Sequence, residues 1–208
     1  CAPLPWAIPH PMAMVTNKKT HLFKSNVSHY EMLRDLNRQW RQWTIDEPAV
    51  FITFNGMSYD EELVRRQFYW NLFESYLTNT NGNSRLDILL MIHNVAAFFP
   101  NILNIPLFEG GPGVSIKQAD IAAANGFEIG DAHDAIADCK LMISLLEKMN
   151  QEKPELIDFF LKISSKTGVQ EAVQQQGFLG LGEVFKREIF RYPVVPCGSK
   201  APNDLMFF

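Results

Sequence analysis

The nine residues DAHDAIADC, from Asp131 to Cys139, place one histidine and three aspartates directly ahead of a long amphipathic run. In and after this stretch, apolar residues recur at the 4-3-4-3 spacing of one helix face: Ala135, Cys139, Met142, Leu146 and Met149. Asp138 lies one turn after the first of these and one turn before the third, so we expect its carboxylate to border the buried face. Because a carboxylate there is costly unless it is paired or metal-bound, Asp138 is a candidate functional residue.

The other ionisable residues of this stretch differ in how well a helix alone explains them. Asp131 suits the helix entry, and Asp134 complements the positive end of the helix dipole. His133 has no such explanation. It can face the same site as Asp138 only if it precedes the regular helix, because five helical steps would turn it away. We therefore predict that His133 lies on the loop ahead of the helix that carries Asp138.

A second candidate acid, Asp60, follows a predicted strand. The strand, Ala49 to Phe54, reads AVFITF and is continuously apolar, as expected of a buried strand. Ser58 and Glu61 have the spacing of a capping box, which leaves Asp60 at the second helical position without a capping role. Ligands of open α/β sheets bind beyond the carboxyl ends of strands. The competing interpretation is that Asp60, like Glu61 and Glu62, only complements the helix dipole.

The remaining pattern predicts an α/β fold. Further helices are expected from the capping box at Ser28, after Ser58, over Arg85–Phe99, over Ser115–Gly126, from Ala135 and from Pro154. Residues 1–27 are rich in proline and are predicted to form an extended loop. From Gly168 onward, Gln, Gly and short β-like runs predict a second, β-rich unit. We therefore predict two domains, residues 1–153 and residues 154–208.

Composition limits the classes of function. The net charge of −4 excludes a basic footprint for nucleic acid over the whole chain, so any such site must be local. With 47% hydrophobic residues the chain can form a sizeable core, and no run of eighteen apolar residues predicts a membrane span. The three cysteines, Cys1, Cys139 and Cys197, are far apart and fit neither a disulfide framework nor a zinc site. A cytoplasmic location fits this pattern best.

The two aspartates and the histidine have the chemistry of a metal-dependent hydrolase. Carboxylate oxygens suit hard cations such as Mg²⁺. Two such cations about 4 Å apart can stabilise the attacking and leaving oxygens of a phosphodiester. A histidine with a pKa near ~6.5 can accept a proton from the attacking water at neutral pH. Asp60, Asp138 and His133 therefore predict a site for divalent cations with a general base.

Several motifs resemble those of a known nuclease family. HDAIAD, from His133 to Asp138, matches the His-x-Ala-x-x-Asp third motif of the DEDD exonucleases that use histidine as the base. NGMSYDEELVRRQFYWNLF, NSRLDILL and DAHDAIADCKLMISLLEKM together resemble the exodeoxyribonuclease I family of bacteria, in the same order. The resemblance implies a ribonuclease-H-like exonuclease domain followed by an SH3-like β domain. It also implies 3′→5′ removal of nucleoside 5′-monophosphates from single-stranded DNA with Mg²⁺ or Mn²⁺.

The resemblance also implies roles for individual residues and partners. Asp60 and Asp138 match metal ligands of the family, and His133 matches its base. Arg65 and Tyr76 match residues that contact single-stranded DNA, and their spacing of eleven would place both on one face of one helix. Single-stranded DNA is the implied partner, with a single-strand-binding protein as a further one, and the implied state is a monomer away from membranes.

Other positions match the family less closely. Lys117 and His93 stand where the family has arginines that contact DNA, and Asp87 matches an acid near the site with a supporting role. Thr78 and Thr80 stand where a stacking tryptophan is expected, which weakens the predicted grip on bases.

The first family motif, Asp-x-Glu on an apolar strand, has no counterpart between Cys1 and Phe208. We therefore expect this sequence to be an internal part of a longer exonuclease, inactive by itself. Two alternatives stay open: a related DEDD nuclease that acts on RNA or proofreads a polymerase, and a non-catalytic module that binds single strands or a protein. The β-rich segment after residue 165 favours an exonuclease of the exodeoxyribonuclease I type over a related DEDD nuclease.

Overall fold

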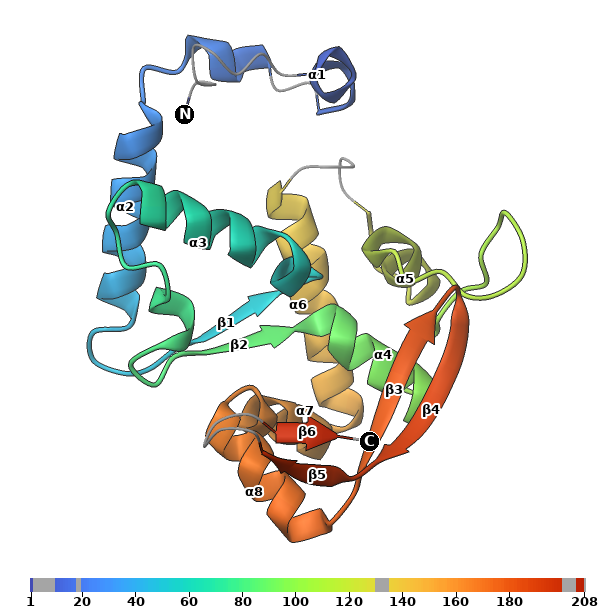
Figure 1. The fold of residues 1–208 in the computed structure, drawn as a ribbon. Helices are drawn as coiled ribbons and strands as arrows, with labels where there is room; N and C mark the ends of the chain where they lie inside the picture. The colour runs from blue at the N-terminus through green and yellow to red at the C-terminus, as the bar shows by residue number, and fades with distance from the viewer. Residues whose placement is uncertain (2–9, 18–19, 130–134, 200–204, 208) are drawn as a thin grey trace. The chain divides into compact units, whose positions relative to one another are not determined.

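A computed structural model describes residues 1, 10–17, 20–129, 135–199 and 205–207 (Figure 1). Asp131, His133 and Asp134 lie outside the described residues. The chain divides into two compact units, Cys1–Ala49 with Met57–Asn83, and Val50–Gly56 with Ser84–Phe208.

The first unit is helical. It contains α1 (Pro11–Asn17), a 3₁₀ turn η1 (Thr20–Lys24), α2 (His29–Trp43), α3 (Asp60–Trp70) and η3 (Leu77–Asn79). The predicted capping box opens α2, since the Ser28 hydroxyl accepts from the Glu31 N–H at 3.2 Å and the Glu31 carboxylate accepts from the Ser28 N–H at 2.9 Å. Buried Phe68 packs edge-on against Trp40 and Phe73, at ring distances of 5.7 and 6.1 Å. These aromatic contacts join α3 to α2.

Two predictions for this unit are wrong. Residues 11–17 form α1 rather than an extended loop, because the prolines cluster before and at its first residue, where proline is tolerated. The second is the capping box at Ser58, which does not form. Ser58 belongs to the short turn η2 (Gly56–Ser58), the N-cap of α3 is Tyr59, and no side chain caps the helix. Asp60 is therefore the first helical residue.

The second unit begins with a parallel strand pair, β1 (Val50–Thr53) and β2 (Ser84–Asp87), in the register Val50↔Ser84 to Thr53↔Asp87. The predicted strand is thus confirmed, although its side chains are only partly buried. The helix predicted over Arg85–Phe99 exists only as α4 (Ile88–Phe98). Its first residues form β2 instead, because pairing with β1, more than thirty residues away in the sequence, overrides the local helical pattern.

The core of the second unit lies among α4, α5 (Gln118–Ala124), α6 (Ala135–Glu152) and α7 (Pro154–Ile163). Its fully buried members are Ile88, Met91, Ile92, Val95, Leu103, Ile121, Leu145 and Met149. On α6 the buried stripe is Leu141, Leu145 and Met149, whereas Ala135 and Cys139 are exposed. The predicted apolar face was therefore misplaced at its N-terminal end, because the first turn of α6 carries no core contact.

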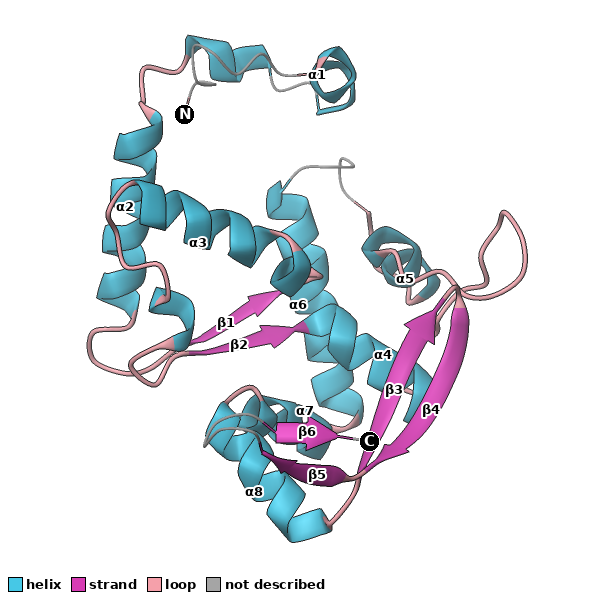
Figure 2. Cartoon of the chain, in the orientation of Figure 1, coloured by secondary structure: helices cyan, strands magenta, loops and turns pink. Residues whose placement is uncertain are grey.

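The C-terminal segment contains α8 (Lys166–Gln176), the antiparallel hairpin of β3 (Leu179–Phe185) and β4 (Glu188–Val194), and the antiparallel pair β5 (Pro196–Ser199) and β6 (Leu205–Phe207), as Figure 2 shows. The expected β-rich end is confirmed from Leu179 on, but α8 was not predicted. Ser165 caps α8 by accepting from the Gly168 N–H, and Gly177 ends it with φ 70°. Gly168 was read as the start of a β segment and is instead a buried helix residue.

The hairpin β3–β4 packs on α4. A Cβ at Gly182 would come within 2.6 to 2.8 Å of Ala97, Asn94 and His93, so only glycine permits this approach. The Asn94 side chain accepts from the Gly182 N–H at 2.9 Å, and Arg191 donates to the Ala97 carbonyl. The α/β class is confirmed. No helix of the described residues is long and apolar enough to span a membrane.

Candidate active site and nucleic-acid interface

The predicted site residues fall into both units. Asp60, Arg65 and Tyr76 lie in the first unit. The second unit holds Asp87, His93, Lys117 and Asp138. His133 lies outside the described residues, so its predicted place beside Asp138 stays a prediction. The two groups are described separately.

Arg65 and Tyr76 form the best-defined part of the site. Arg65 Nη1 donates to the Tyr76 hydroxyl at 2.8 Å, and the guanidinium carbon lies 5.4 Å from the centre of the Tyr76 ring. Tyr76 does not lie on α3, as the spacing of eleven had suggested, because α3 ends at Trp70 and Tyr76 precedes η3. A turn in the chain brings the two side chains together. Tyr76 is 48% exposed, so about half of this residue stays accessible to solvent beside Arg65.

Glu62 holds Arg65 in this position. Both Nε and Nη2 of Arg65 donate to Glu62 Oε2, the first at 2.9 Å, and Arg66 Nε donates to Glu62 Oε1 at 2.6 Å. Hydrogen bonds from Arg65 and then Arg66 lower the pKa of Glu62. The result is a fixed guanidinium beside an exposed aromatic ring. This pair suits a phosphate and a base face of a single strand.

Asp60 is the exposed first residue of α3. Its neighbour Glu61 differs, because both carboxylate oxygens of Glu61 are shielded from solvent. The sequence reading had grouped Glu61 with the ordinary dipole acids. Its burial is a feature that the spacing of apolar residues did not reveal.

Asp87 ends β2 and is 3% exposed. Its Oδ1 accepts from the Leu89 N–H at 3.0 Å, which caps α4, and from the Asn55 N–H at 2.7 Å, in the turn that follows β1. Asn55 has a positive φ of 59°. Asp87 thus fixes the carboxyl ends of both parallel strands, which fits the supporting role that the resemblance implied.

Asp138 lies in the first turn of α6 and is exposed. It precedes Leu141 by three residues and Leu145 by seven, so it continues the buried stripe of α6 in the N-terminal direction. Asp138 is therefore placed on the same helix face as the buried residues, at a turn where that face is exposed. The Asp138 carbonyl accepts from the side-chain amide of Gln118, on α5, at 2.6 Å. Sequence analysis missed Gln118, since no local spacing connects two residues twenty positions apart.

His93, on α4, is half-buried, and its Nε2 lies out of contact with solvent and without a hydrogen-bond partner among the described residues. Burial lowers the pKa of His93, and the charges of Glu183 and Asp87 oppose this shift only in part. His93 is therefore neutral at pH 7. As a neutral side chain it differs from the cationic arginine that the resemblance implies at this position.

Lys117 is exposed at the N-cap of α5. Behind it, buried Ser115 donates to Asp120 Oδ2 at 2.5 Å and its N–H donates to the Pro106 carbonyl at 2.8 Å. These bonds fix the backbone that leads into α5. Lys117 is therefore an exposed cation on a rigid support.

The donor set fits a divalent cation in kind. Asp60 and Asp138 are exposed carboxylates, and hard cations such as Mg²⁺ prefer oxygen ligands. In the part of the chain that the structure describes, no three His, Cys, Asp or Glu side chains gather into a metal site. Each of these carboxylates, taken by itself, can supply one part of a coordination sphere.

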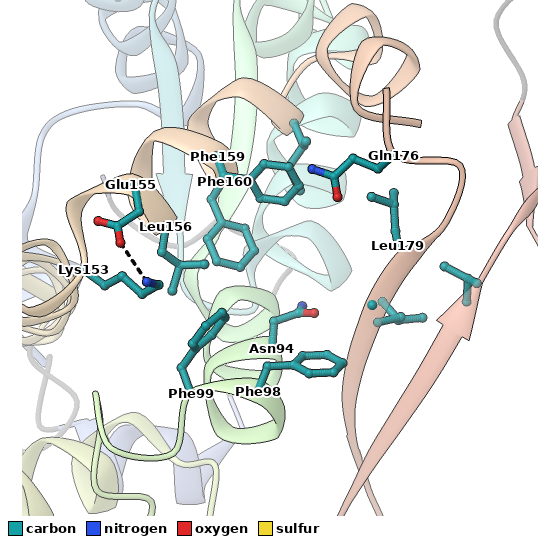
Figure 3. A pocket seen from close by; sticks show the side chains of 14 residues that line it. Asn94, Phe98, Phe99, Lys153, Glu155, Leu156, Phe159, Phe160, Gln176 and Leu179 are labelled. Atoms are coloured by element: carbon teal, nitrogen blue, oxygen red, sulfur yellow. Dashed lines mark hydrogen bonds and ion pairs between the residues drawn. The ribbon is translucent and has the colours of Figure 1, made fainter. Parts of the chain in front are cut away.

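The second unit also contains an apolar pocket of about 550 Å³ between α4, α7 and β3 (Figure 3). Its walls include Phe98, Phe99, Phe159 and Phe160. Lys153 lies at its edge, where Nζ bonds Glu155 at 2.7 Å and stands 5.5 Å from the Phe99 ring centre. The pocket is thus an aromatic cavity with an ion pair at its rim.

No family model matches the chain. Among curated proteins, the chain is 32% identical over 128 residues to Exodeoxyribonuclease I of Buchnera aphidicola subsp. Acyrthosiphon pisum, covering 61% of this chain and 31% of that protein. It is 30% identical over 126 residues to Exodeoxyribonuclease I of Escherichia coli strain K12, covering 60% and 26%. The chain spans about a third or less of the curated relatives it matches.

Solved structures agree with this similarity. The fold matches E. coli Exonuclease I in complex with a dT13 oligonucleotide, with a TM-score of 0.80 and 20% identity over 100% of this chain and 46% of that one. The "ExoI/SSB-Ct complex" matches with a TM-score of 0.76 and 19% identity over 97% and 44%. The zinc-bound form of the E. coli ExoI–ssDNA complex matches with 0.78 and 22% over 100% and 45%. The predicted resemblance is confirmed: this chain is similar in sequence to bacterial exodeoxyribonuclease I and has the fold of the matching part of it.

Proposed function

We propose that the protein is a 3′→5′ exonuclease that releases nucleoside 5′-monophosphates from single-stranded DNA. The observation that carries the proposal is the sequence similarity to Exodeoxyribonuclease I, at 32% identity over 128 residues. The fixed Arg65 guanidinium beside the exposed Tyr76 ring supports it, because this pair suits a phosphate and an unstacked base. Solved structures of the same fold include E. coli Exonuclease I in complex with a dT13 oligonucleotide and a zinc-bound E. coli ExoI–ssDNA complex.

In this proposal, Asp60 and Asp138 hold divalent cations. When bound, the cations stabilise charge on the attacking and leaving oxygens of the phosphodiester. Their identity is proposed as Mg²⁺ or Mn²⁺, because carboxylate oxygens are hard ligands. Asp60 would supply a carboxylate ligand from the first turn of α3, and Asp138 would supply one from the first turn of α6. His133 accepts the proton of the attacking water.

The remaining site residues bind the DNA strand. Arg65 contacts a phosphate and Tyr76 stacks on a base. Lys117 contacts a second phosphate from the N-cap of α5. His93 contributes to DNA binding as a neutral imidazole, because burial lowers its pKa. Asp87 supports the site by joining the ends of β1 and β2.

We propose that residues 1–153 belong to a ribonuclease-H-like exonuclease domain and that residues 154–208 lead into an SH3-like domain. The hairpin β3–β4 and the pair β5–β6 supply four antiparallel strands for the second domain. The protein is proposed to act as a monomer in the bacterial cytoplasm.

A single-strand-binding protein is the proposed second partner. One matching structure is a complex named for the C-terminal segment of such a protein. The apolar pocket beside Phe159 could receive an apolar chain terminus, with Lys153 near its carboxylate. In fluorescence titrations, Phe159→Ala should weaken binding of a C-terminal peptide at least about tenfold, as expected for a buried aromatic anchor. Unchanged affinity would remove this pocket from the interaction.

The experiment that tests the proposed activity compares substrates end-labelled at either terminus. The full-length protein that carries this sequence should release labelled mononucleotides at once from 3′-labelled single-stranded DNA and only late from 5′-labelled DNA. Preference for RNA would favour a related DEDD nuclease. Binding of single strands without any release would favour a non-catalytic module.

A further inference from the structure

We propose that Gln118 is a positioning residue that holds Asp138 ready to bind a metal ion. The inference rests on the proposed function, since it assigns a partner to the proposed metal ligand. It starts from one long-range bond: the side-chain amide of Gln118 donates to the carbonyl oxygen of Asp138 at 2.6 Å. The two residues lie on neighbouring helices, α5 and α6, of the same unit.

The donor side of this bond is rigid. Ile121 and Ala122 of α5 are fully buried. Ser115 and Asp120 bond to one another before and within the first turn of α5. At the other end, Asn125 accepts from the Asn104 N–H at 3.0 Å and donates to its carbonyl at 2.9 Å. Gln118, the first residue of α5, therefore projects from a helix that is anchored at both ends.

The acceptor side lacks such support. The described first turn of α6 is largely exposed, and burial begins only at Leu141. Helix ends fray when packing does not hold them. A carbonyl oxygen has two lone pairs, so Asp138 can accept from Gln118 without losing its bond within the helix. The amide of Gln118 thus fixes the backbone whose side chain is the proposed ligand.

A fixed backbone matters for a metal ligand. The groups that orient a ligand from outside the coordination sphere contribute strongly to affinity, and their loss costs on the order of tenfold or more. Gln118 also follows Lys117 directly, so the same bond joins the turn that offers a cation to DNA with the turn that offers a carboxylate to metal. We infer that Gln118 acts through Asp138 and touches neither ion nor DNA.

The test uses the full-length protein with three variants. Gln118→Leu removes the donor, and Gln118→Glu keeps the shape but cannot donate at neutral pH. Gln175→Leu, on an exposed position of α8, is the matched control. Calorimetric titration with Mn²⁺ alone should show affinity reduced about tenfold in both Gln118 variants and unchanged in the control. Amide exchange should accelerate at the first turn of α6 and stay constant at Leu145 and Met149.

Kinetics supply a third readout. At limiting Mg²⁺ the Gln118 variants should lose kcat, high Mg²⁺ should restore it, and KM for DNA should not change. Normal Mn²⁺ affinity, or faster exchange throughout the second unit, would overturn the role of Gln118. The Asp138→Asn variant separates a failure of the inference on Gln118 from a failure of the proposed metal assignment. If Asp138→Asn itself keeps wild-type Mn²⁺ affinity, the proposed metal assignment fails, and the inference on Gln118 fails with it.

Discussion

At the scale of single residues, some of the candidate side chains are held by hydrogen bonds and others are exposed to solvent. Arg65 is fixed by Glu62 and Tyr76, and Asp87 by two backbone N–H groups. Asp60, Lys117 and Asp138 are exposed. The sequence motifs select candidate residues, and their roles stay predictions. They did not predict the contacts, because Tyr76 reaches Arg65 across a turn and Gln118 reaches Asp138 across twenty residues.

Arg65→Ala should weaken binding of single-stranded DNA and make the remaining affinity less dependent on salt, by about one unit of slope, because one phosphate contact is lost. The measurement is fluorescence anisotropy at several salt concentrations. Arg38→Ala is the control, since Arg38 is exposed on α2 and bonds only locally to Asp35. An equal effect of both variants would mean that only overall charge matters.

Tyr76→Ala should reduce DNA affinity by about 1–3 kcal/mol with little change in salt slope, because a stacking contact carries no charge. The competing interpretation makes Tyr76 a packing residue. Its exposure of 48% argues against that interpretation. Strong unfolding of the variant, with normal DNA affinity in the folded remainder, would establish the packing role.

His133→Ala should slow hydrolysis by ~10²–10⁴-fold in the full-length protein and leave DNA binding intact, as expected when a general base is removed. Single-turnover assays with bound DNA measure this step. An unchanged rate would remove His133 from the mechanism.

His93 gives a prediction about pH. Burial lowers its pKa in the folded state, so the unfolded chain takes up this proton at higher pH than the folded chain does. The contribution of His93 to the free energy of unfolding is therefore complete above the pKa of the unfolded chain, ~6.5. It decreases as the pH falls below that value. Urea titrations at pH 7.5 and pH 5 should show a larger loss for the wild type than for His93→Asn. Equal losses would contradict the assignment.

At the scale of elements, local signals predicted helices well and strands poorly. The capping box at Ser28, Pro154 at the start of α7 and Gly126 after α5 all mark real helix ends. β2 was missed because its residues pair with a strand distant in sequence. α8 was missed because its Gln-rich, Gly-containing sequence lacks a clear apolar period, and its stability comes from packing through Ala172 and Val173.

The hairpin β3–β4 depends on close approach to α4. Gly182→Ala would place a methyl group 2.6 Å from the Ala97 side chain and 2.8 Å from α4 backbone, so it should cost about 1–3 kcal/mol of stability. Leu181→Ala, at a 46% exposed position of the same strand, should cost less. Chemical denaturation measures both. A neutral Gly182→Ala would mean that the hairpin does not pack on α4 as described.

At the scale of the whole molecule, the α/β fold that the resemblance predicts agrees with the matching solved structures, and the sequence similarity supports the proposed activity. The arrangement of the metal ligands could not be predicted in the same detail as the fold. The proposed carboxylates, Asp60 and Asp138, come from separate units, so no local spacing connects them. Among the described residues, no three His, Cys, Asp or Glu side chains form a cluster that could hold a metal ion. Two carboxylates alone should hold cations weakly and leave the attacking water unaligned.

The most direct test of the account is Mg²⁺-dependent release of mononucleotides from single-stranded DNA by three proteins. Residues 1–208 alone should release none. The same sequence joined to an upstream strand that carries Asp-x-Glu should release them, and Asp138→Asn in that joined protein should abolish the release. Robust release by residues 1–208 that survives Asp138→Asn would contradict both the metal assignment and the proposed requirement for further acids.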